Sequence, residues 1–154
     1  MSDVKRVWLV TGGSGQVGGA LATAPPAGVR ILAPGRTELD LSDPKLDPTT
    51  SLARYGVTAI VNCGAYTQVD RAESEEMLAT QVNGHAAGVL ARAAAAARIP
   101  IVQVSTDYVF AGDHPDAYAE DDPANPRTAY GRSKLEGERQ VAASGARASR
   151  KCDR

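Results

Sequence analysis

The segment TAYGRSKLEGE, residues 128–138, places a tyrosine and a lysine four positions apart, at Tyr130 and Lys134. Residues four apart on an α-helix lie on one face, so the two side chains can act together if this segment is helical. A phenol has an ordinary pKa of about 10, and a nearby ammonium lowers that pKa because the positive charge favours the phenolate. Such a pair can donate a proton, but the same spacing is also common on exposed helices. The rest of the chain must distinguish the two interpretations.

A glycine-rich segment near the start, VTGGSGQVGG at residues 10–19, follows an apolar stretch and leads into a helix-forming one. Gly13, Gly15 and Gly18 fit G-x-G-x-x-G, whereas Gly12, Gly15 and Gly18 fit G-x-x-G-x-x-G. Without a Cβ, the backbone can approach a pyrophosphate, and the helix N-terminus offers it free N–H groups. The strand–loop–helix context that this motif requires is met, so we expect a dinucleotide site. A P-loop is disfavoured because no Gly-Lys-Ser/Thr follows.

The end of the second predicted strand carries an arginine where dinucleotide-binding proteins often have an acid for the ribose 2′-hydroxyl. Gly35 and Arg36 occupy this position. A guanidinium can pair with a 2′-phosphate through its planar fork, which favours NADPH over NADH as the cofactor. The alternative is that Arg36 is simply solvated. Asp40 and Leu41 follow, and we expect them to bracket the adenine.

Strand and helix patterns alternate along the chain, which predicts right-handed βαβ units and a parallel sheet. The fold class is therefore α/β, with a Rossmann-like parallel sheet that has helices on both faces. Gly84 and Gly88 interrupt the longest predicted helix and indicate a kink or close packing there. The predicted strands are 4–11, 29–33, 57–63 and 99–105, and the predicted helices are 16–23, 49–55, 73–97 and 128–143.

Polar clusters follow the third and fourth predicted strands. Residues 62–67 read NCGAYT, and residues 105–110 read STDYVF. Sites in open α/β sheets gather at the carboxyl ends of the strands. We therefore expect these two clusters and the helix that carries Tyr130 to converge beside the glycine loop.

Four motifs in order, TGGSGQVGG, VNCGAYTQVDRAE, STDYVFAGD and YGRSKLEGE, resemble the extended short-chain dehydrogenase/reductase superfamily. Within it, the words GQVG, AYTQVDRAE and STDYVF are most similar to the dTDP-4-dehydrorhamnose reductase family. The resemblance covers roughly residues 5–140. It implies reduction of the C4 ketone of dTDP-4-dehydro-L-rhamnose to dTDP-L-rhamnose, with NADPH or NADH as the hydride source.

The resemblance also implies roles for individual residues. Tyr130 matches the proton donor, and Lys134 matches the residue that tunes it and holds the nicotinamide ribose. Thr106 matches a hydroxyl residue that bonds the substrate oxygen, and Asp107 matches a substrate-contacting position. The cofactor-binding matches are Gly15, Gln16 and Val17 in the pyrophosphate loop and Ala65, Tyr66 and Thr67 after the third strand.

Other interpretations of these residues stay open. Thr106 could merely cap a loop, Asp107 could start a turn, and Tyr66 could be a packing aromatic. The whole chain could instead be a non-catalytic NADP-binding regulatory module. It could also be another extended short-chain enzyme, an epimerase or dehydratase that acts on a nucleotide sugar.

Composition excludes several classes of function. Apolar residues make up 43% of the 154 residues and the net charge is −1, so we expect a globular protein that binds neither nucleic acid nor membrane. The apolar stretch at the N-terminus is too short for a signal peptide or a membrane span, which predicts a cytoplasmic protein. His85 and His114 have no ligand-like spacing with Cys63 or Cys152, and we expect no metal site. A nucleotide sugar is the expected partner, and a homodimer is left open.

The last residues lack the apolar periodicity of a strand or helix. We expect residues 1–143 to form an incomplete, C-terminally truncated NAD(P)-binding domain and residues 144–154 to be a disordered tail unlike the family. Four parallel strands would then leave an open sheet edge. The expectation is a chain that keeps the cofactor half-site with little or no reductase activity.

Overall fold

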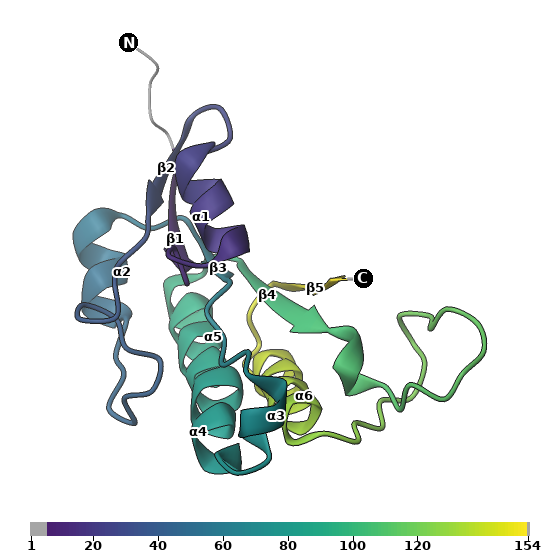
Figure 1. Ribbon diagram of the computed structural model, residues 1–154. Coiled ribbons are helices and arrows are strands. Elements are labelled where there is room, and N and C mark those ends of the chain that lie inside the picture. Colours follow the sequence, from purple (N-terminus) through teal and green to yellow (C-terminus); the bar gives the residue numbers. More distant parts are fainter. Residues whose placement is uncertain (1–5, 154) are drawn as a thin grey trace.

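The computed structural model describes the chain from Arg6 to Asp153, and its centre is one parallel sheet of five strands in the order β2-β1-β3-β4-β5 (Figure 1). Neighbouring strands are in a register that places Val10 beside Val61. Val61 in turn lies beside Val102. The strands are β1 (Arg6–Thr11), β2 (Val29–Leu32), β3 (Ala59–Asn62), β4 (Ile101–Thr106) and β5 (Ala148–Asp153).

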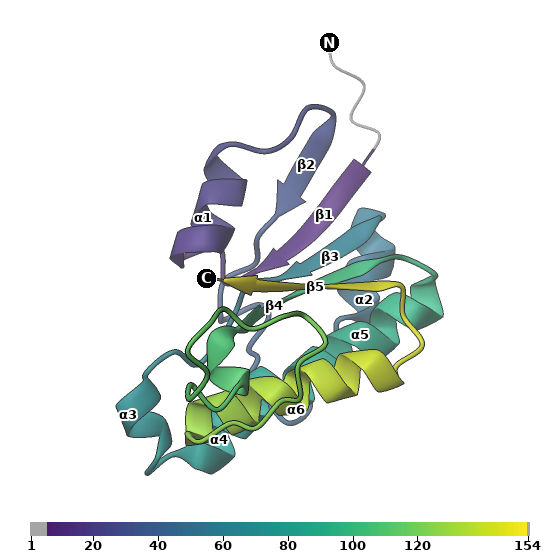
Figure 2. The same ribbon diagram turned by 90° about the vertical axis from the view of Figure 1, so that its right-hand side faces the viewer.

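Helices lie on both faces of the sheet, as predicted. Figure 2 shows α1 (Gln16–Thr23) on one face, whereas α2 (Thr49–Tyr55), α5 (Ala86–Ala97) and α6 (Ala129–Ala143) lie on the other. The chain therefore crosses to the opposite face between β2 and β3. This reversal of direction beside β1 is where open α/β sheets form a ligand crevice. In the described part of the chain, no helix crosses a membrane, because none is long and apolar enough.

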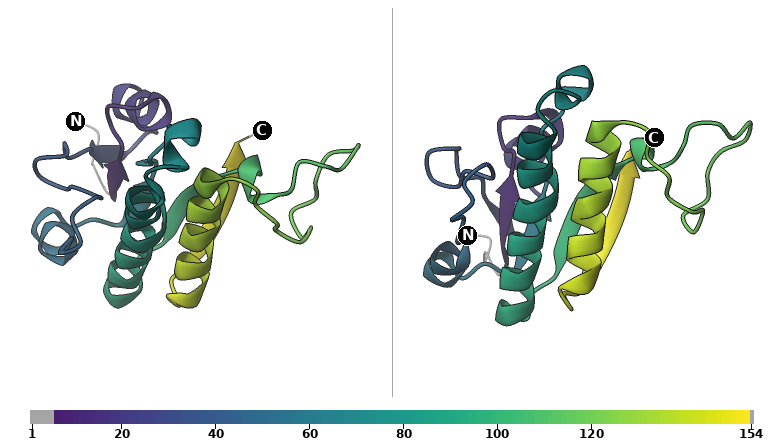
Figure 3. Two further views of the ribbon diagram at one scale, coloured as in Figure 1. Left: turned by 60° about the horizontal axis from the view of Figure 1, so that its bottom comes forward. Right: turned by 90° about the horizontal axis from the view of Figure 1, so that it is seen from below.

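The main core lies between the sheet and the pair α5 and α6, which run side by side beneath it (Figure 3). Leu9, Ile60 and Ile101 point from adjacent strands to this face and are at most 1% exposed. They meet Leu90 and a row of alanines on α5. Small alanine side chains let the helix lie close to the strands, and each fully buried leucine or isoleucine contributes about 1.5–3 kcal/mol.

The predicted helix over residues 73–97 is divided in the structure. A short helix α3 (Val69–Ala72) precedes α4 (Glu76–Thr80), a π-helical turn η1 (Gln81–His85) and α5. The prediction of a kink or close packing at Gly84 and Gly88 is confirmed. A Cβ on Gly84 or Gly88 would meet the side chains of Glu136 and Gln140 on α6. The two helices therefore cross closely at these glycines.

The expectation of a disordered tail is wrong for residues 148–153. They form β5, which pairs in parallel with β4 along its whole length, from Ile101 beside Ala148 to Thr106 beside Asp153. The sheet thus has five strands rather than four. Because β4 would otherwise present unpaired N–H and C=O groups, backbone pairing stabilises a strand there despite the absence of an apolar period. A pattern of apolar and polar residues does not predict backbone pairing of this kind.

A long loop connects β4 to α6. It begins with a 3₁₀ turn, η2 (Asp107–Val109), and then projects away from the body of the molecule (Figure 1). Phe110 stacks on Tyr118 with ring centroids 4.5 Å apart, and Arg127 pairs with Asp113. These contacts close the projecting loop on itself before α6 begins.

Candidate active site

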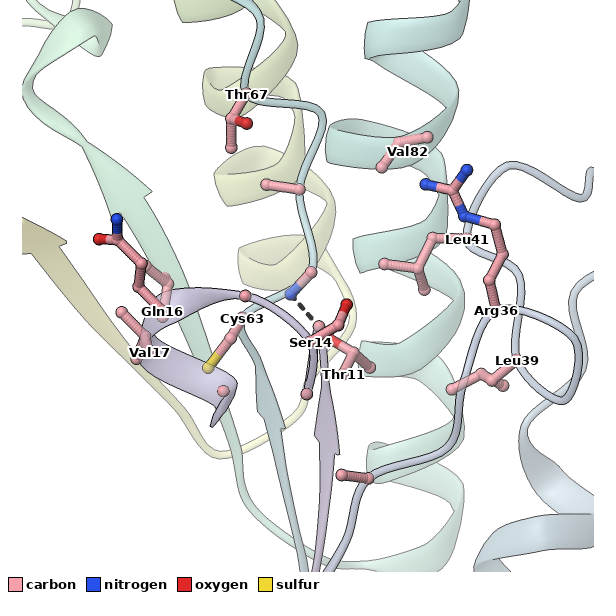
Figure 4. Close-up of a pocket in the computed structure, with 18 of the residues that line it drawn as sticks. Thr11, Ser14, Gln16, Val17, Arg36, Leu39, Leu41, Cys63, Thr67 and Val82 are labelled. Carbon is pink, nitrogen blue, oxygen red and sulfur yellow. Dashed lines mark hydrogen bonds between the residues drawn. The ribbon is translucent and has the colours of Figure 1, made fainter. Parts of the chain in front are cut away.

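A pocket of about 780 Å³ lies at the carboxyl ends of β1 to β4, on the side where the crevice is expected (Figure 4). In Figure 4, Gln16 and Val17 lie at one end of the pocket, and Arg36 and Leu41 lie at the other. Most of the predicted site residues line this pocket: Gly12, Gly15, Gln16, Val17, Gly18, Arg36, Asp40, Leu41, Ala65, Thr67, Tyr130 and Lys134.

The glycine loop owes its shape to contacts that only glycine permits. Gly12 has a φ of +67°, and a Cβ there would lie 2.7 Å from the backbone nitrogen of Gly64. The N–H of Gly15 donates to the carbonyl of Gly12 over 2.9 Å, and a Cβ on Gly18 would overlap that same oxygen. The spacing Gly12, Gly15, Gly18 therefore forms the turn. Gly13 instead packs against Ala33 at the end of β2.

The start of α1 faces the pocket. Gly15 is its N-cap, and Gln16 is its first residue. The first N–H groups of a helix have no acceptor within the helix and carry the positive end of its dipole. These N–H groups can therefore donate hydrogen bonds to an anionic group such as a pyrophosphate.

A buried chain of polar side chains supports the loop from below. The N–H of Gly64 donates to Thr11 Oγ1 over 2.9 Å, and that hydroxyl donates to the side-chain oxygen of Asn62. The Asn62 amide then donates to Gln103 Oε1 over 2.7 Å. All three side chains are at most 2% exposed. The chain joins β1, β3 and β4 and holds Gly64 against Gly12, which sets the floor of the pocket.

The end of the pocket beside β2 carries the charged residues. Arg36 is exposed at the pocket lining, near Asp40. The Asp40 carboxylate accepts from both the hydroxyl and the N–H of Ser42, over 2.7 and 2.8 Å. These two bonds, with a smaller contribution from Arg36, lower the pKa of Asp40. Asp40 is therefore a fixed anion, while the guanidinium of Arg36 faces open space at the mouth.

Tyr130 and Lys134 lie in the first two turns of α6 and line the same pocket. Thr128 caps this helix, because its hydroxyl accepts from the N–H of Gly131 over 3.0 Å. Lys134 is only 3% exposed, and its Nζ donates to the carbonyl of Val104 on β4 over 2.6 Å. The helical interpretation of TAYGRSKLEGE is therefore confirmed. The tyrosine and lysine share one face and meet the glycine loop across the pocket.

The residues after β4 come close to Tyr130 but do not line the pocket. A Cβ on Gly131 would overlap the carbonyl oxygen of Tyr108, and the rings of Tyr108 and Tyr130 meet edge to face at 5.5 Å. Thr106 is 8% exposed, and its hydroxyl donates to Asp107 over 3.1 Å. The substrate roles of Thr106 and Asp107 stay predictions.

Tyr66 is the one predicted cofactor residue that the pocket lining lacks. Its ring packs against the apolar cluster of Ala72, Ala79 and Ala129, and its hydroxyl donates to Glu75 over 2.7 Å. Burial, helped by Glu75, raises the pKa of Tyr66. Its backbone instead positions the neighbouring residues, because its N–H donates to the side chain of Asn83 over 2.8 Å.

Some lining residues were missed by sequence reasoning. Thr11 and Ser14 lie inside the glycine motif, and Ser42 follows Leu41, so each was one step from a predicted position. Val82 lies on the π-helical turn and reaches the pocket only because η1 packs beside the loop after β3. No local pattern marks Val82.

Comparison with known proteins agrees with this geometry. Residues 6–149 match the model of the family described as RmlD substrate binding domain. A dTDP-4-dehydrorhamnose reductase of Streptomyces griseus is 44% identical over 135 residues, which are 87% of this chain and 44% of that protein. A probable dTDP-4,6-dihydroxy-2-methyloxan-3-one 4-ketoreductase of Streptomyces antibioticus is 40% identical over 136 residues.

The chain is also similar to solved structures of dTDP-4-dehydrorhamnose reductases. The dTDP-4-dehydrorhamnose reductase of Bacillus anthracis, determined in complex with NADP, superposes with a TM-score of 0.90 and 32% identity. The match covers 96% of this chain and 53% of that one. The chain thus spans about half the length of the relatives that it matches. By its sequence and its fold, it belongs to the RmlD substrate binding domain family.

Proposed function

We propose that this chain forms the NADPH-binding and proton-donating part of a dTDP-4-dehydrorhamnose reductase. Such an enzyme reduces the C4 ketone of dTDP-4-dehydro-L-rhamnose to give dTDP-L-rhamnose. The observation that carries the proposal is that Tyr130 and Lys134 line the same pocket as the glycine loop. The names of the relatives and the NADP complex of the Bacillus anthracis protein support it.

The roles proposed for the residues combine their positions with the family resemblance. When bound, NADPH would supply the hydride for C4 of the keto sugar. Tyr130 would give its phenolic proton to the alkoxide oxygen that results, and the ammonium of Lys134 would stabilise the phenolate left behind. The Thr106 hydroxyl would donate to the same substrate oxygen, and Asp107 would contact the sugar. The N-terminus of α1, with Gly15, would hold the pyrophosphate.

A turnover assay tests the catalytic part of the proposal. The purified chain is mixed with NADPH and dTDP-4-dehydro-L-rhamnose, and loss of NADPH absorbance is followed at high protein concentration. Turnover is expected to be slow, because the relatives are about twice as long. Replacing Tyr130 with phenylalanine should lower the rate at least ~100-fold, the usual contribution of a positioned proton donor.

One outcome would count against this catalytic role. A Tyr130→Phe chain that turns over like the wild type would exclude Tyr130 as the donor. Tight NADPH binding with no turnover would agree with the expectation of a cofactor half-site that has little or no reductase activity.

The choice of cofactor depends on Arg36, whose side chain lies exposed at the mouth of the pocket. We expect NADPH to bind at least ~10-fold more tightly than NADH, because a charged hydrogen bond to the 2′-phosphate contributes about 1.5–3 kcal/mol. The Arg36→Ala chain should lose this preference. Thermal unfolding with each cofactor measures it, since a ligand raises the melting temperature with its affinity.

Arg30 provides the matched control for this comparison. It is an exposed arginine on β2 that does not line the pocket. Arg30→Ala should keep the preference for NADPH. Equal responses to the two cofactors in the wild-type chain would remove the 2′-phosphate role of Arg36.

A further inference from the structure

Two side chains on one face of α6 hold two consecutive residues of β4. Lys134 Nζ donates to the carbonyl of Val104 over 2.6 Å, and the Ser105 hydroxyl donates to Glu138 Oε1 over 2.5 Å. Lys134 and Glu138 are one helical turn apart, so both face the sheet. Ser105 is 5% exposed and Lys134 is 3% exposed, whereas Glu138 is half-buried, so both contacts are partly shielded from water.

A third contact lies one turn earlier on the same helix face. There the backbone of Gly131 packs directly against the carbonyl of Tyr108, with no room for a Cβ between them. Gly131, Lys134 and Glu138 follow the spacing i, i+3, i+7, which is one stripe of a helix. Together they attach α6 to the segment 104–108 at three points, so the helix cannot slide along β4 or roll without breaking one.

These attachments adjoin the proposed catalytic groups. Tyr130 immediately precedes Gly131, and Thr106 immediately follows Ser105. Catalytic groups must be held within about 0.5 Å of their working positions by the residues around them.

We propose that Glu138 is a positioning residue, which through Ser105 sets the register of α6 on β4 and so holds Lys134 and Tyr130 at the nicotinamide end of the pocket. Glu138 does not itself line the pocket, whereas Ser105 does. The assignment of the nicotinamide end rests on the proposed function. The attachment of α6 to β4 does not.

The test is a double-mutant cycle on the whole chain. Glu138→Met removes the acceptor at similar length, and Ser105→Ala removes the donor. Each should weaken NADPH binding about 10-fold, and the loss in the double variant should be smaller than the two single losses combined, because the two residues share the Ser105–Glu138 bond. Glu138→Gln keeps an amide oxygen that accepts from Ser105 and should bind like the wild type. Ser74→Ala, an exposed turn serine, is the matched control.

Adenosine 2′,5′-bisphosphate separates positioning from general loosening. It carries the adenine and the 2′-phosphate but no nicotinamide, so its affinity should stay unchanged in all variants. Equal losses for this ligand and for NADPH would show a merely structural role and overturn the inference. Additive losses in the double variant would also overturn it.

A readout that needs no cofactor is the acetylation rate of Lys134 by mass spectrometry, with exposed Lys45 as the internal reference. Glu138→Met and Ser105→Ala should each speed Lys134 labelling several-fold, and Glu138→Gln should not. Unchanged labelling in every variant would overturn the positioning role even if NADPH binds. If these two variants label Lys134 faster but the wild-type chain does not bind NADPH, the attachment of α6 to β4 would be supported and the proposed function would be rejected.

Discussion

Replacing Gly12 with alanine is expected to reduce strongly the rise in melting temperature that NADPH produces. Gly12 has a φ of +67°, and the new Cβ would lie 2.7–2.9 Å from backbone atoms of Gly64 and Cys63. Backbone atoms cannot move aside as the end of a side chain can, so the loop after β3 would be forced away from the glycine loop. Overpacking of this kind costs about 1–3 kcal/mol in stability. The proposed pyrophosphate site adjoins the displaced segments, and we expect NADPH affinity to fall at least ~10-fold.

Gly28 provides a close control for this substitution. It has a φ of +71°, but nothing lies within 4 Å of a Cβ built there. Gly28→Ala therefore carries the strain of a left-handed backbone without the overlap, and it should keep the response to NADPH. If Gly12→Ala and Gly28→Ala behaved alike in thermal shift and in titration, the close approach of Gly12 to Gly64 would not shape the cofactor site.

The second large effect is expected at Gly137, where α6 crosses η1 and α5. A Cβ on Gly137 would overlap the carbonyl oxygen of Asn83. Alanine in place of glycine would ordinarily stabilise a helix interior by about 1 kcal/mol. Here the overlap should outweigh that gain and destabilise the chain by about 1–3 kcal/mol. The melting temperature should then fall by several degrees.

Arg139 supplies the reference for helix propensity in the same helix. It is exposed two residues further along α6, so Arg139→Ala compared with Arg139→Gly measures the propensity contribution alone. We expect alanine to be the more stable of that pair. A Gly137→Ala chain with a melting temperature at or above that of the wild type would mean that the helices can separate at no cost, and that the crossing does not need glycine.

The local features of the site were predictable because each rests on a short segment. The glycine spacing at 12, 15 and 18 determines a tight turn within seven residues, and the structure has that turn. Tyr130 and Lys134 are brought to one face by the period of a single helix, whose start at Thr128 is a capping hydroxyl. Four of the five strands were apparent from short β-rich runs closed by polar or glycine residues.

Other features escaped prediction because distant segments determine them. β5 is formed by backbone pairing with β4, and the sequence of residues 148–153 shows no apolar periodicity. The Tyr66 side chain turns away from the pocket, because Glu75 and the apolar cluster beside α6 offer it a partner and a packing surface. Glu138 reads in the sequence as one more surface acid, and only the approach of β4 identifies its bond to Ser105.

Sequence alone was therefore enough for the α/β class, the glycine turn and the placement of Tyr130 and Lys134 on one helix face. Turns, caps and helical periods depend on neighbours within a few residues, so they can be predicted from short segments of the sequence. The floor of the pocket, the attachment of α6 and the fifth strand were decided by tertiary structure. Thr11 and Gly64 are 53 positions apart, and Ser105 and Glu138 are 33 apart. Hydrogen bonds over such separations form only when the whole sheet and its helices have assembled.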